Sequence, residues 1–150
     1  MVFVTPAMQE LLEAIHAEPR AVTVQGPLLC LSMLRGVKQF ENREKKLKPG
    51  WYYLHAGKNL ETPMEYAAII GRTWKAAPQE RSASASKVVG LMQIGEATRA
   101  SELQDPWALF GYAHRILATL DFEEPSIAAT GKRGVWPYHH HKPAITRIRN

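Results

Sequence analysis

The chain has 150 residues, of which 45% are hydrophobic and 22% charged, and its formal net charge is +5 at pH 7. This length and composition indicate one globular domain with a sizeable core and exclude a disordered chain. The single cysteine, Cys30, excludes a disulfide framework and a multi-cysteine zinc site. No apolar run approaches the roughly 18 to 20 residues of a membrane span, and the N-terminus does not resemble a signal peptide. We therefore expect an intracellular protein, cytoplasmic or nuclear, without a membrane partner.

The positive charge is concentrated in two segments. Residues 35–48 hold six basic and two acidic side chains, and residues 132–150 hold five basic side chains and no acidic one. Two basic segments on a mildly acidic body indicate an anionic partner, with nucleic acid as the first candidate. The alternative is that these charges only keep the surface soluble.

The N-terminal half is predicted to alternate helices and strands. Residues 1–19 are expected to form a helix, begun at Thr5-Pro6, that packs on a domain formed by residues 20–150. Gly36 is placed to end a second, buried helix in the left-handed conformation. The elements expected after the first helix are a strand at 21–24, the buried helix at 28–35, an extended segment at 39–43 and an aromatic strand at 51–55.

In the second half, Thr62-Pro63-Met64-Glu65 is a capping-box sequence and predicts a helix to about Lys75, with Tyr66, Ile69 and Ile70 on its inner face. Residues 76–86 are small and polar and predict an exposed loop. The almost continuously apolar run 88–94 predicts a strand buried on both faces. Further strands are expected at 111–118, where a helix is the alternative, and at 144–149. Five to six strands and about three helices in mixed order predict an α+β fold around a curved sheet or barrel.

The most specific motif lies at residues 36–43, which fit the pattern Gly-x-Lys-x-x-Glu-x-Arg directly after the buried helix. Glu41 and Arg43 are two apart on an extended segment and therefore share a face, close to Lys38. A carboxylate between two cations forms a charge-compensated cluster that can hold an anion or a polar base edge. The alternative is a surface charge cluster at a helix-to-strand turn.

With its flanking segments, this motif resembles the ASCH domain of the PUA-like superfamily. The segments that carry the resemblance are Val22-Thr23-Val24-Gln25-Gly26-Pro27, the apolar helix, residues 36–43, the loop closing at Gly50, Tyr52 to Lys58, residues 88–96, the segment from Trp107 and residues 131–136. The resemblance implies a small PUA-like mixed β-barrel with the helices packed outside it.

Domains of this superfamily bind RNA or modified nucleobases in a cleft on the barrel. The resemblance therefore implies nucleic-acid binding, RNA before DNA, with a charged cleft for a base or phosphate and no cofactor. The candidate binding residues are Gln25, Gly26, Pro27, Lys38, Glu41, Arg43, His55, Lys58 and Trp136. The His139-His140-His141 tract lacks placed carboxylate or cysteine partners, so no metal site is expected.

Some ASCH proteins are amidohydrolases that remove an acetyl group from modified cytidine with a lysine, a threonine three residues later and a glutamate. Lys38 matches the lysine and Glu96 loosely matches the glutamate, but Glu41 stands where the threonine would be. We expect Glu41 to raise the pKa of Lys38, which opposes a lysine nucleophile and ranks binding above catalysis. If the chain is an enzyme, these three residues are the catalytic candidates and the substrate is a modified nucleoside. A third hypothesis is a protein-interaction module of a coregulator or RNA-processing assembly.

Overall fold

The computed structural model describes residues 6–17, 19–74, 76–122, 127–128, 134–138 and 145–149. Its helices are α1 (Pro6–Ala17), α2 (Pro27–Leu34), α3 (Met64–Thr73), α4 (Pro78–Ser84) and the short 3-10 helix η1 (Ala100–Glu102). Its strands are β1 (Arg20–Val24), β2 (Phe40–Arg43), β3 (Gly50–Ala56), β4 (Lys87–Arg99), β5 (Tyr112–Phe122), β6 (Ile127–Ala128), β7 (Val135–Pro137) and β8 (Ile145–Arg149). The predicted α+β class is confirmed.

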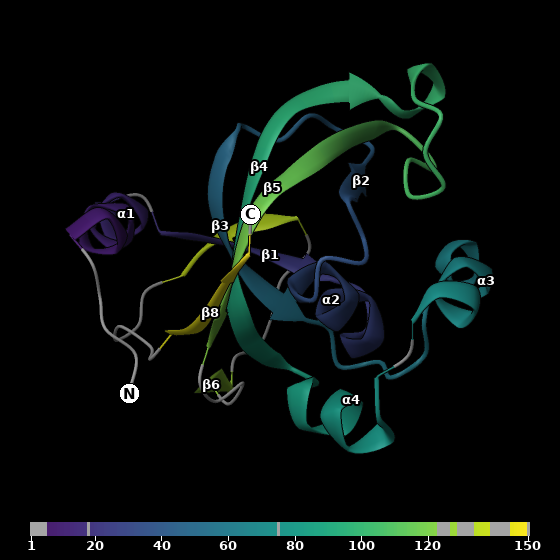
Figure 1. The fold of residues 1–150 in the computed structure, drawn as a ribbon, viewed down its shortest axis with the longest axis horizontal. Coiled ribbons are helices and arrows are strands. Elements are labelled where there is room, and N and C mark those ends of the chain that lie inside the picture. The colour runs from purple at the N-terminus through teal and green to yellow at the C-terminus, as the bar shows by residue number, and fades with distance from the viewer. Residues whose placement is uncertain are drawn as a thin grey trace.

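The described strands form one curled sheet, a half-barrel, whose main path runs β2-β5-β4-β3-β1-β7 (Figure 1). The strands β6 and β8 lie off this path and pair with β4 and β5. Among the described pairs, only β1 and β3 are parallel, and α2 and β2 lie between them in sequence. The expected curved sheet of five to six strands is therefore present as the main path.

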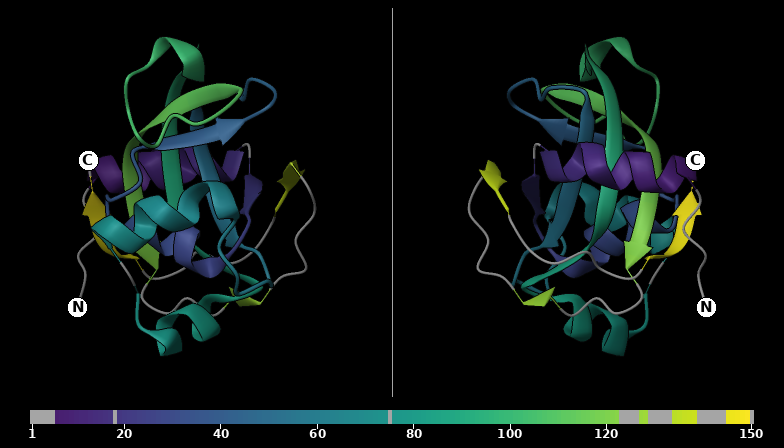
Figure 2. Two further views of the ribbon diagram at one scale, coloured as in Figure 1. Left: turned by 90° about the vertical axis from the view of Figure 1, so that its right-hand side faces the viewer. Right: turned by 90° about the vertical axis from the view of Figure 1, so that its left-hand side faces the viewer.

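Helices cover both faces of this sheet. Helix α1 lies on one side, while α2, α3 and α4 lie on the other (Figures 1 and 2). Ile15 of α1 packs in one apolar cluster with Tyr53 and Leu91, and the second cluster joins α2 and α3 to Leu54 and Met92. Strands β3 and β4 therefore contribute to both clusters, and the prediction that residues 88–94 are buried on both faces is confirmed.

Gly90 lets α2 pack closely on the sheet. A Cβ at this position would lie 2.4 Å from the carbonyl oxygen of Leu120 and 2.8 Å from a methyl group of Leu34. We expect Gly90→Ala to lower the free energy of unfolding by about 1–3 kcal/mol, because backbone and side chain must both shift. Gly71→Ala is the matched control, since nothing lies within 4 Å of its Cβ on α3. Urea unfolding measures both variants, and equal midpoints would contradict this role of Gly90.

The prediction of an exposed loop at residues 76–86 is wrong, because Pro78–Ser84 forms α4. The Ser84 hydroxyl is buried and donates to the carbonyl of Glu80, and Arg35 forms a 3.3 Å ion pair with Glu80. Proline at the first turn also suits a helix start. The small, polar segment 76–86 is thus helical in part, and its Glu80 pairs with Arg35 at the end of α2. Local composition does not reveal this contact.

Two other expectations concern helix ends and the C-terminal segment. Helix α3 is present and Tyr66, Ile69 and Ile70 are buried, but its N-cap is Pro63 and no side chain caps it, so the capping box is absent.

Thr5 and the histidine tract at 139–141 lie outside the described residues, as does much of the second basic segment. Within the described part of the chain, no helix is long and apolar enough to cross a membrane.

Candidate functional site

The structure brings the three charged residues of the motif into direct contact. Nζ of Lys38 donates to Oε1 of Glu41 at 3.1 Å and to the carbonyl of Phe40. Nη2 of Arg43 donates to Oε2 of Glu41 at 3.2 Å. One carboxylate therefore bridges two cations, and we refer to Lys38, Glu41 and Arg43 as the charge cluster.

The end of α2 positions this cluster. Gly36 has a positive φ of 77°, and the backbone N–H groups of Val37 and Lys38 both donate to the carbonyl of Ser32, at 2.9 and 3.1 Å. This turn ends the helix and directs the chain into β2. The two-residue period of β2 then places Glu41 and Arg43 on the same face.

Burial distinguishes the three members of the cluster. The side chain of Lys38 is 0% exposed, that of Glu41 is 4% exposed and that of Arg43 is 22% exposed. Nζ of Lys38 lies 5.2 Å from the centroid of the Tyr66 ring, which covers it from α3. The expected charged cleft therefore differs from the structure: Arg43 reaches the surface, whereas Lys38 does not line an open cavity.

The pKa values of the buried pair follow from burial and charge. Burial raises the pKa of the Glu41 carboxyl, but Lys38 and Arg43 lower it by more, so it lies below its ordinary value of 4.5. Burial is the largest influence on the pKa of Lys38 and lowers it; Glu41 raises this pKa, Arg43 lowers it, and it lies below its ordinary value of 10.5. Glu41 thus acts on the pKa of Lys38 in the expected direction, but burial, which the sequence did not indicate, leaves this pKa lowered as a whole.

Asn42, inside the same motif, joins β2 to two other parts of the fold. Its Nδ2 donates to the Tyr66 hydroxyl at 2.7 Å and to the carbonyl of Trp107 at 2.8 Å. Its Oδ1 accepts from the N–H of Leu109 at 3.0 Å. Asn42 was not among the predicted site residues, although its place between Glu41 and Arg43 was a signal that it belongs to the site. Asn42 fixes the β4–β5 connection and α3 over the charge cluster.

His114 on β5 supports the cluster from the neighbouring strand. Its ring is fully buried, and Nε2 accepts from the N–H of Leu47 at 2.9 Å. Nε2 is therefore unprotonated, so Nδ1 carries the proton and donates to the carbonyl of Glu41 at 3.0 Å. This neutral tautomer ties both β2 and the loop after it to β5.

His55 and Trp136 meet at Thr23 of β1. Nε1 of Trp136 donates to the Thr23 hydroxyl at 3.1 Å, and that hydroxyl lies 3.2 Å from Nδ1 of His55. The carbonyl of Thr23 accepts from Arg43 at 2.9 Å, so Thr23 links this pair to the charge cluster. Both rings are buried, His55 at 3% and Trp136 at 7% exposure. A base cannot stack on Trp136 unless that ring moves.

The remaining predicted site residues are not part of the charge cluster. Gly26, with φ of 97°, and Pro27 are buried at the start of α2, whereas Gln25 and Lys58 are exposed beside it. Glu96 is exposed on β4. In the described residues, no hydrogen bond or ion pair joins any of these five to Lys38, Glu41 or Arg43.

A second polar region lies over the ends of β2, β4 and β5. Lys45, Lys46 and Lys48 are exposed on residues 44–49, which we call the basic loop. Nζ of Lys46 and the guanidinium of Arg99 lie 5.3 and 5.9 Å from the centroid of the Tyr112 ring. A pocket of about 550 Å³, lined by Arg99 and Tyr112 among others, opens beside this ring. The sequence analysis identified the basic charge here but not the pocket.

Known proteins give no further assignment of this site. No model of a known protein family matches the chain, and no curated protein matches it in sequence. Within the described ranges, no group of three or more His, Cys, Asp or Glu residues is placed to hold a metal ion. The resemblance to the ASCH domain remains a prediction from the motif.

Proposed function

We propose that this chain binds nucleic acid, RNA before DNA, through the basic loop and the cations beside it. The observation that carries the proposal is that Lys46 and Arg99 both lie near the Tyr112 ring at the end of the β4–β5 hairpin, with Lys45 and Lys48 exposed on the same loop as Lys46. Clustered lysine and arginine side chains bind phosphate and release condensed counterions. The preference for RNA follows from the resemblance of the motif to the ASCH domain.

The charge cluster has a supporting part in this proposal. Arg43 pairs with Tyr112 of β5, and Tyr112 pairs with Arg99 of β4, so the two arginines flank one tyrosine across three adjacent strands. Arg43, the β2 member of these three residues, donates a hydrogen bond to the Glu41 carboxylate. Nε of Arg43 is buried and has no hydrogen-bond partner among the described residues. Arg43 is the member of the cluster that can reach a bound anion.

The triple variant Lys45→Gln, Lys46→Gln, Lys48→Gln tests this proposal. We expect it to weaken binding of a single-stranded RNA of mixed sequence about tenfold and to lower the slope of log K against log salt by about 2, since each lost phosphate contact removes roughly 0.7. Fluorescence anisotropy over about 50 to 200 mM salt measures both quantities.

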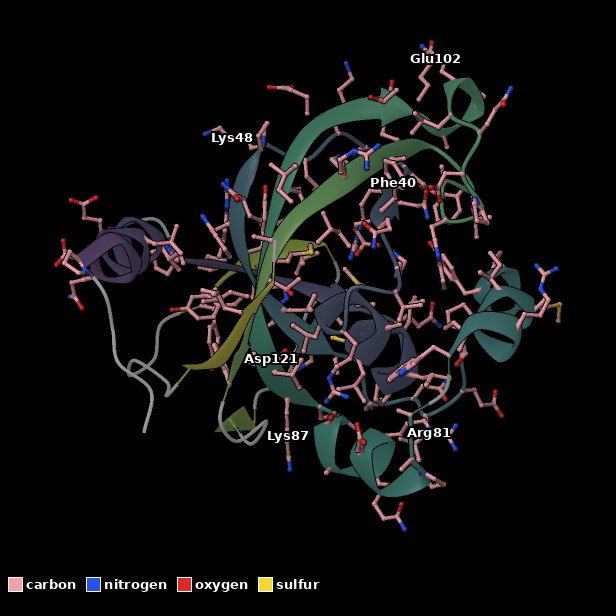
Figure 3. The ribbon with its side chains drawn as sticks, viewed as in Figure 1. Phe40, Lys48, Arg81, Lys87, Glu102 and Asp121 are labelled. Atoms are coloured by element: carbon pink, nitrogen blue, oxygen red, sulfur yellow. The ribbon has the colours of Figure 1, made fainter. Side chains whose placement is uncertain are left out.

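A double variant, Arg72→Gln, Lys87→Gln, which removes two positive charges away from the basic loop, is the control for a change in net charge. Arg72 is exposed on α3 and Lys87 begins β4, and Figure 3 shows Lys87 at the opposite end of the molecule from Lys48. The control variant should bind nearly as the unchanged protein does. Equal losses in both variants, or no binding to RNA or DNA at any salt concentration, would contradict the proposal.

One observation favours the amidohydrolase as a second candidate. Burial lowers the pKa of Lys38, which brings its neutral, nucleophilic form closer to working pH. A substrate would have to reach a fully buried amine, and Glu96 lies exposed rather than beside it. Incubation with acetylated cytidine decides between the two: release of free cytidine that disappears in Lys38→Met, with that variant still folded, would favour the enzyme.

A further inference from the structure

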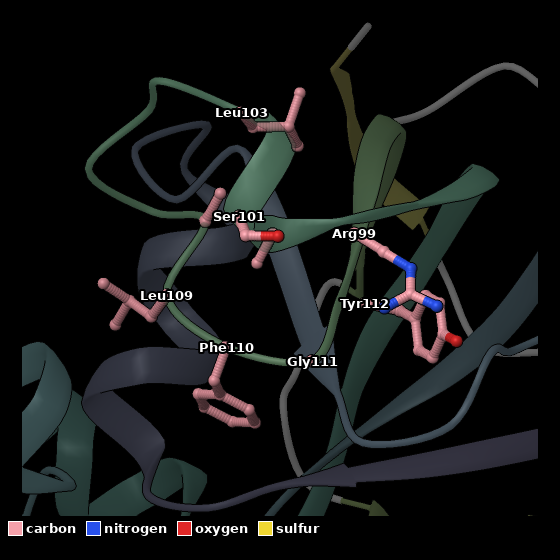
Figure 4. Close-up of a pocket in the computed structure, with 9 residues that line it drawn as sticks. Arg99, Ser101, Leu103, Leu109, Phe110, Gly111 and Tyr112 are labelled. Atoms are coloured by element: carbon pink, nitrogen blue, oxygen red, sulfur yellow. The ribbon is translucent and has the colours of Figure 1, made fainter.

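The pocket beside Tyr112 is separate from the charge cluster and lies where β4 passes through η1 into β5. Its volume of about 550 Å³ falls in the range of small-molecule sites, roughly 300 to 1,000 Å³. Figure 4 shows Leu109 and Phe110 projecting from the loop on one side and Arg99 lying against Tyr112 on the other. We call it the loop pocket.

The backbone around the loop pocket is held at several points. The N–H of Ala100 donates to the carbonyl of Gly111 at 2.9 Å, which closes the loop at its base. Asn42 holds the N–H of Leu109 at 3.0 Å. Gly111 has φ of 57°, and a Cβ there would lie 2.4 Å from the carbonyl oxygen of Arg43. The pocket is therefore a formed feature of the fold and is anchored to β2.

The lining of the pocket combines exposed apolar surface with positive charge. Phe110 is 41% exposed and Leu109 is 36% exposed. Arg99, which lines the pocket, and Lys46, from the basic loop beside it, both approach the ring of Tyr112, so two positive charges lie near one aromatic side chain. An anion beside these cations would offset their positive charge, and a flat apolar group would cover Phe110. A nucleobase with its phosphate carries both features in one ligand.

We propose that the loop pocket holds one unpaired base of a single-stranded nucleic acid, stacked on Phe110, with the adjoining phosphate at Arg99 and Lys46. This inference rests on the proposed function and assigns it a base-binding position. An uncharged apolar peptide would cover Phe110 and Leu109 but would leave the two cations without a counter-charge. A double-stranded nucleic acid offers the phosphates but no free base face.

The test compares Phe110→Ser with Phe110→Tyr, which keeps an aromatic ring for stacking. We expect Phe110→Ser to weaken binding of single-stranded RNA about tenfold with an unchanged salt slope, and Phe110→Tyr to bind nearly normally. Arg99→Gln should lower the salt slope by about 0.7. On a fully paired RNA duplex, Phe110→Ser should have no effect. Leu117→Ser is the control, because Leu117 is 42% exposed on β5 and does not line the pocket.

The results separate this inference from the proposed function. If the triple lysine variant loses binding while Phe110→Ser binds normally, the base position is overturned and nucleic-acid binding stands. An equal loss on single-stranded and paired RNA also overturns it. If the unchanged protein binds no nucleic acid, both proposals fail. Sedimentation that shows a dimer lost in Phe110→Ser would assign the exposed ring to self-association instead.

Discussion

Glu41→Gln is expected to lower the free energy of unfolding by about 3–5 kcal/mol, because it leaves the Lys38 ammonium buried without its counter-charge. The carboxylate is 4% exposed, and it accepts from Lys38, from Arg43 and from the N–H of Asn42. Urea unfolding at neutral pH measures the effect. Glu44→Gln is the matched control, since Glu44 is exposed in the basic loop and its loss should change stability by about 0.5 kcal/mol or less.

A second variant shows that the loss comes from the unpaired charge. Lys38→Met combined with Glu41→Gln removes both buried charges, and we expect it to recover most of the stability lost in Glu41→Gln. Arg43 tolerates this change because its side chain is partly exposed to water. A double variant that is as unstable as Glu41→Gln alone would show that the pair does not act through charge compensation.

The pH dependence of the free energy of unfolding also tests this charge compensation, and it needs only the single variant Glu41→Gln. The pKa of Glu41 is below 4.5 in the folded state, so the stability it contributes is complete above pH 4.5 and is lost as the pH falls through the folded pKa. The difference in stability between the unchanged protein and Glu41→Gln should therefore be at its full value at neutral pH and shrink in acid. A difference that grows on acidification would contradict the ionised, doubly paired carboxylate.

Asn42→Ala is expected to cost about 3 kcal/mol, because it leaves the N–H of Leu109, the carbonyl of Trp107 and the hydroxyl of Tyr66 without this partner. Hydrogen exchange should also become faster at the amide of Leu109, since its acceptor is gone. Gln39→Ala removes an exposed amide with one backbone bond, to Gly36, and serves as the control.

The Asn42 variant also connects stability to binding. Two of its three hydrogen bonds, to Trp107 and Leu109, fix the β4–β5 connection, so their loss should loosen the loop pocket and weaken RNA binding even at temperatures where the protein stays folded. Unchanged exchange at Leu109 in a destabilised variant would show that Asn42 supports the fold globally and does not anchor this loop.

The sequence predicted those features that local pattern controls. The apolar run in β4 implied burial on both faces, and the glycine after α2 marked the end of that helix. The two-residue spacing of Glu41 and Arg43 was enough to place both side chains on one face of β2. Each of these features depends on neighbours a few residues apart, which is the range over which periodicity and turn chemistry act.

The burial of Lys38 could not be predicted in this way. Lysine is normally exposed, and its cover here comes from Tyr66 on α3, far along the chain. The same limit applies to Asn42, whose partners Tyr66 and Trp107 lie 24 and 65 residues away. Because the sign of the Lys38 pKa shift depends on burial, an argument from the adjacent Glu41 alone could not give the direction of the whole shift.

Strand β1 takes its two neighbours from distant parts of the chain, with consequences for synthesis. It pairs with β3 on one side and β7 on the other, and Thr23 bonds to Trp136, 113 positions later. A nascent chain leaving the ribosome N-terminus first therefore displays one edge of β1 until β7 has been synthesised. Unpaired strand edges associate with other chains. Translation products that stop before β7 are accordingly expected to aggregate, and a holdase chaperone should suppress that aggregation.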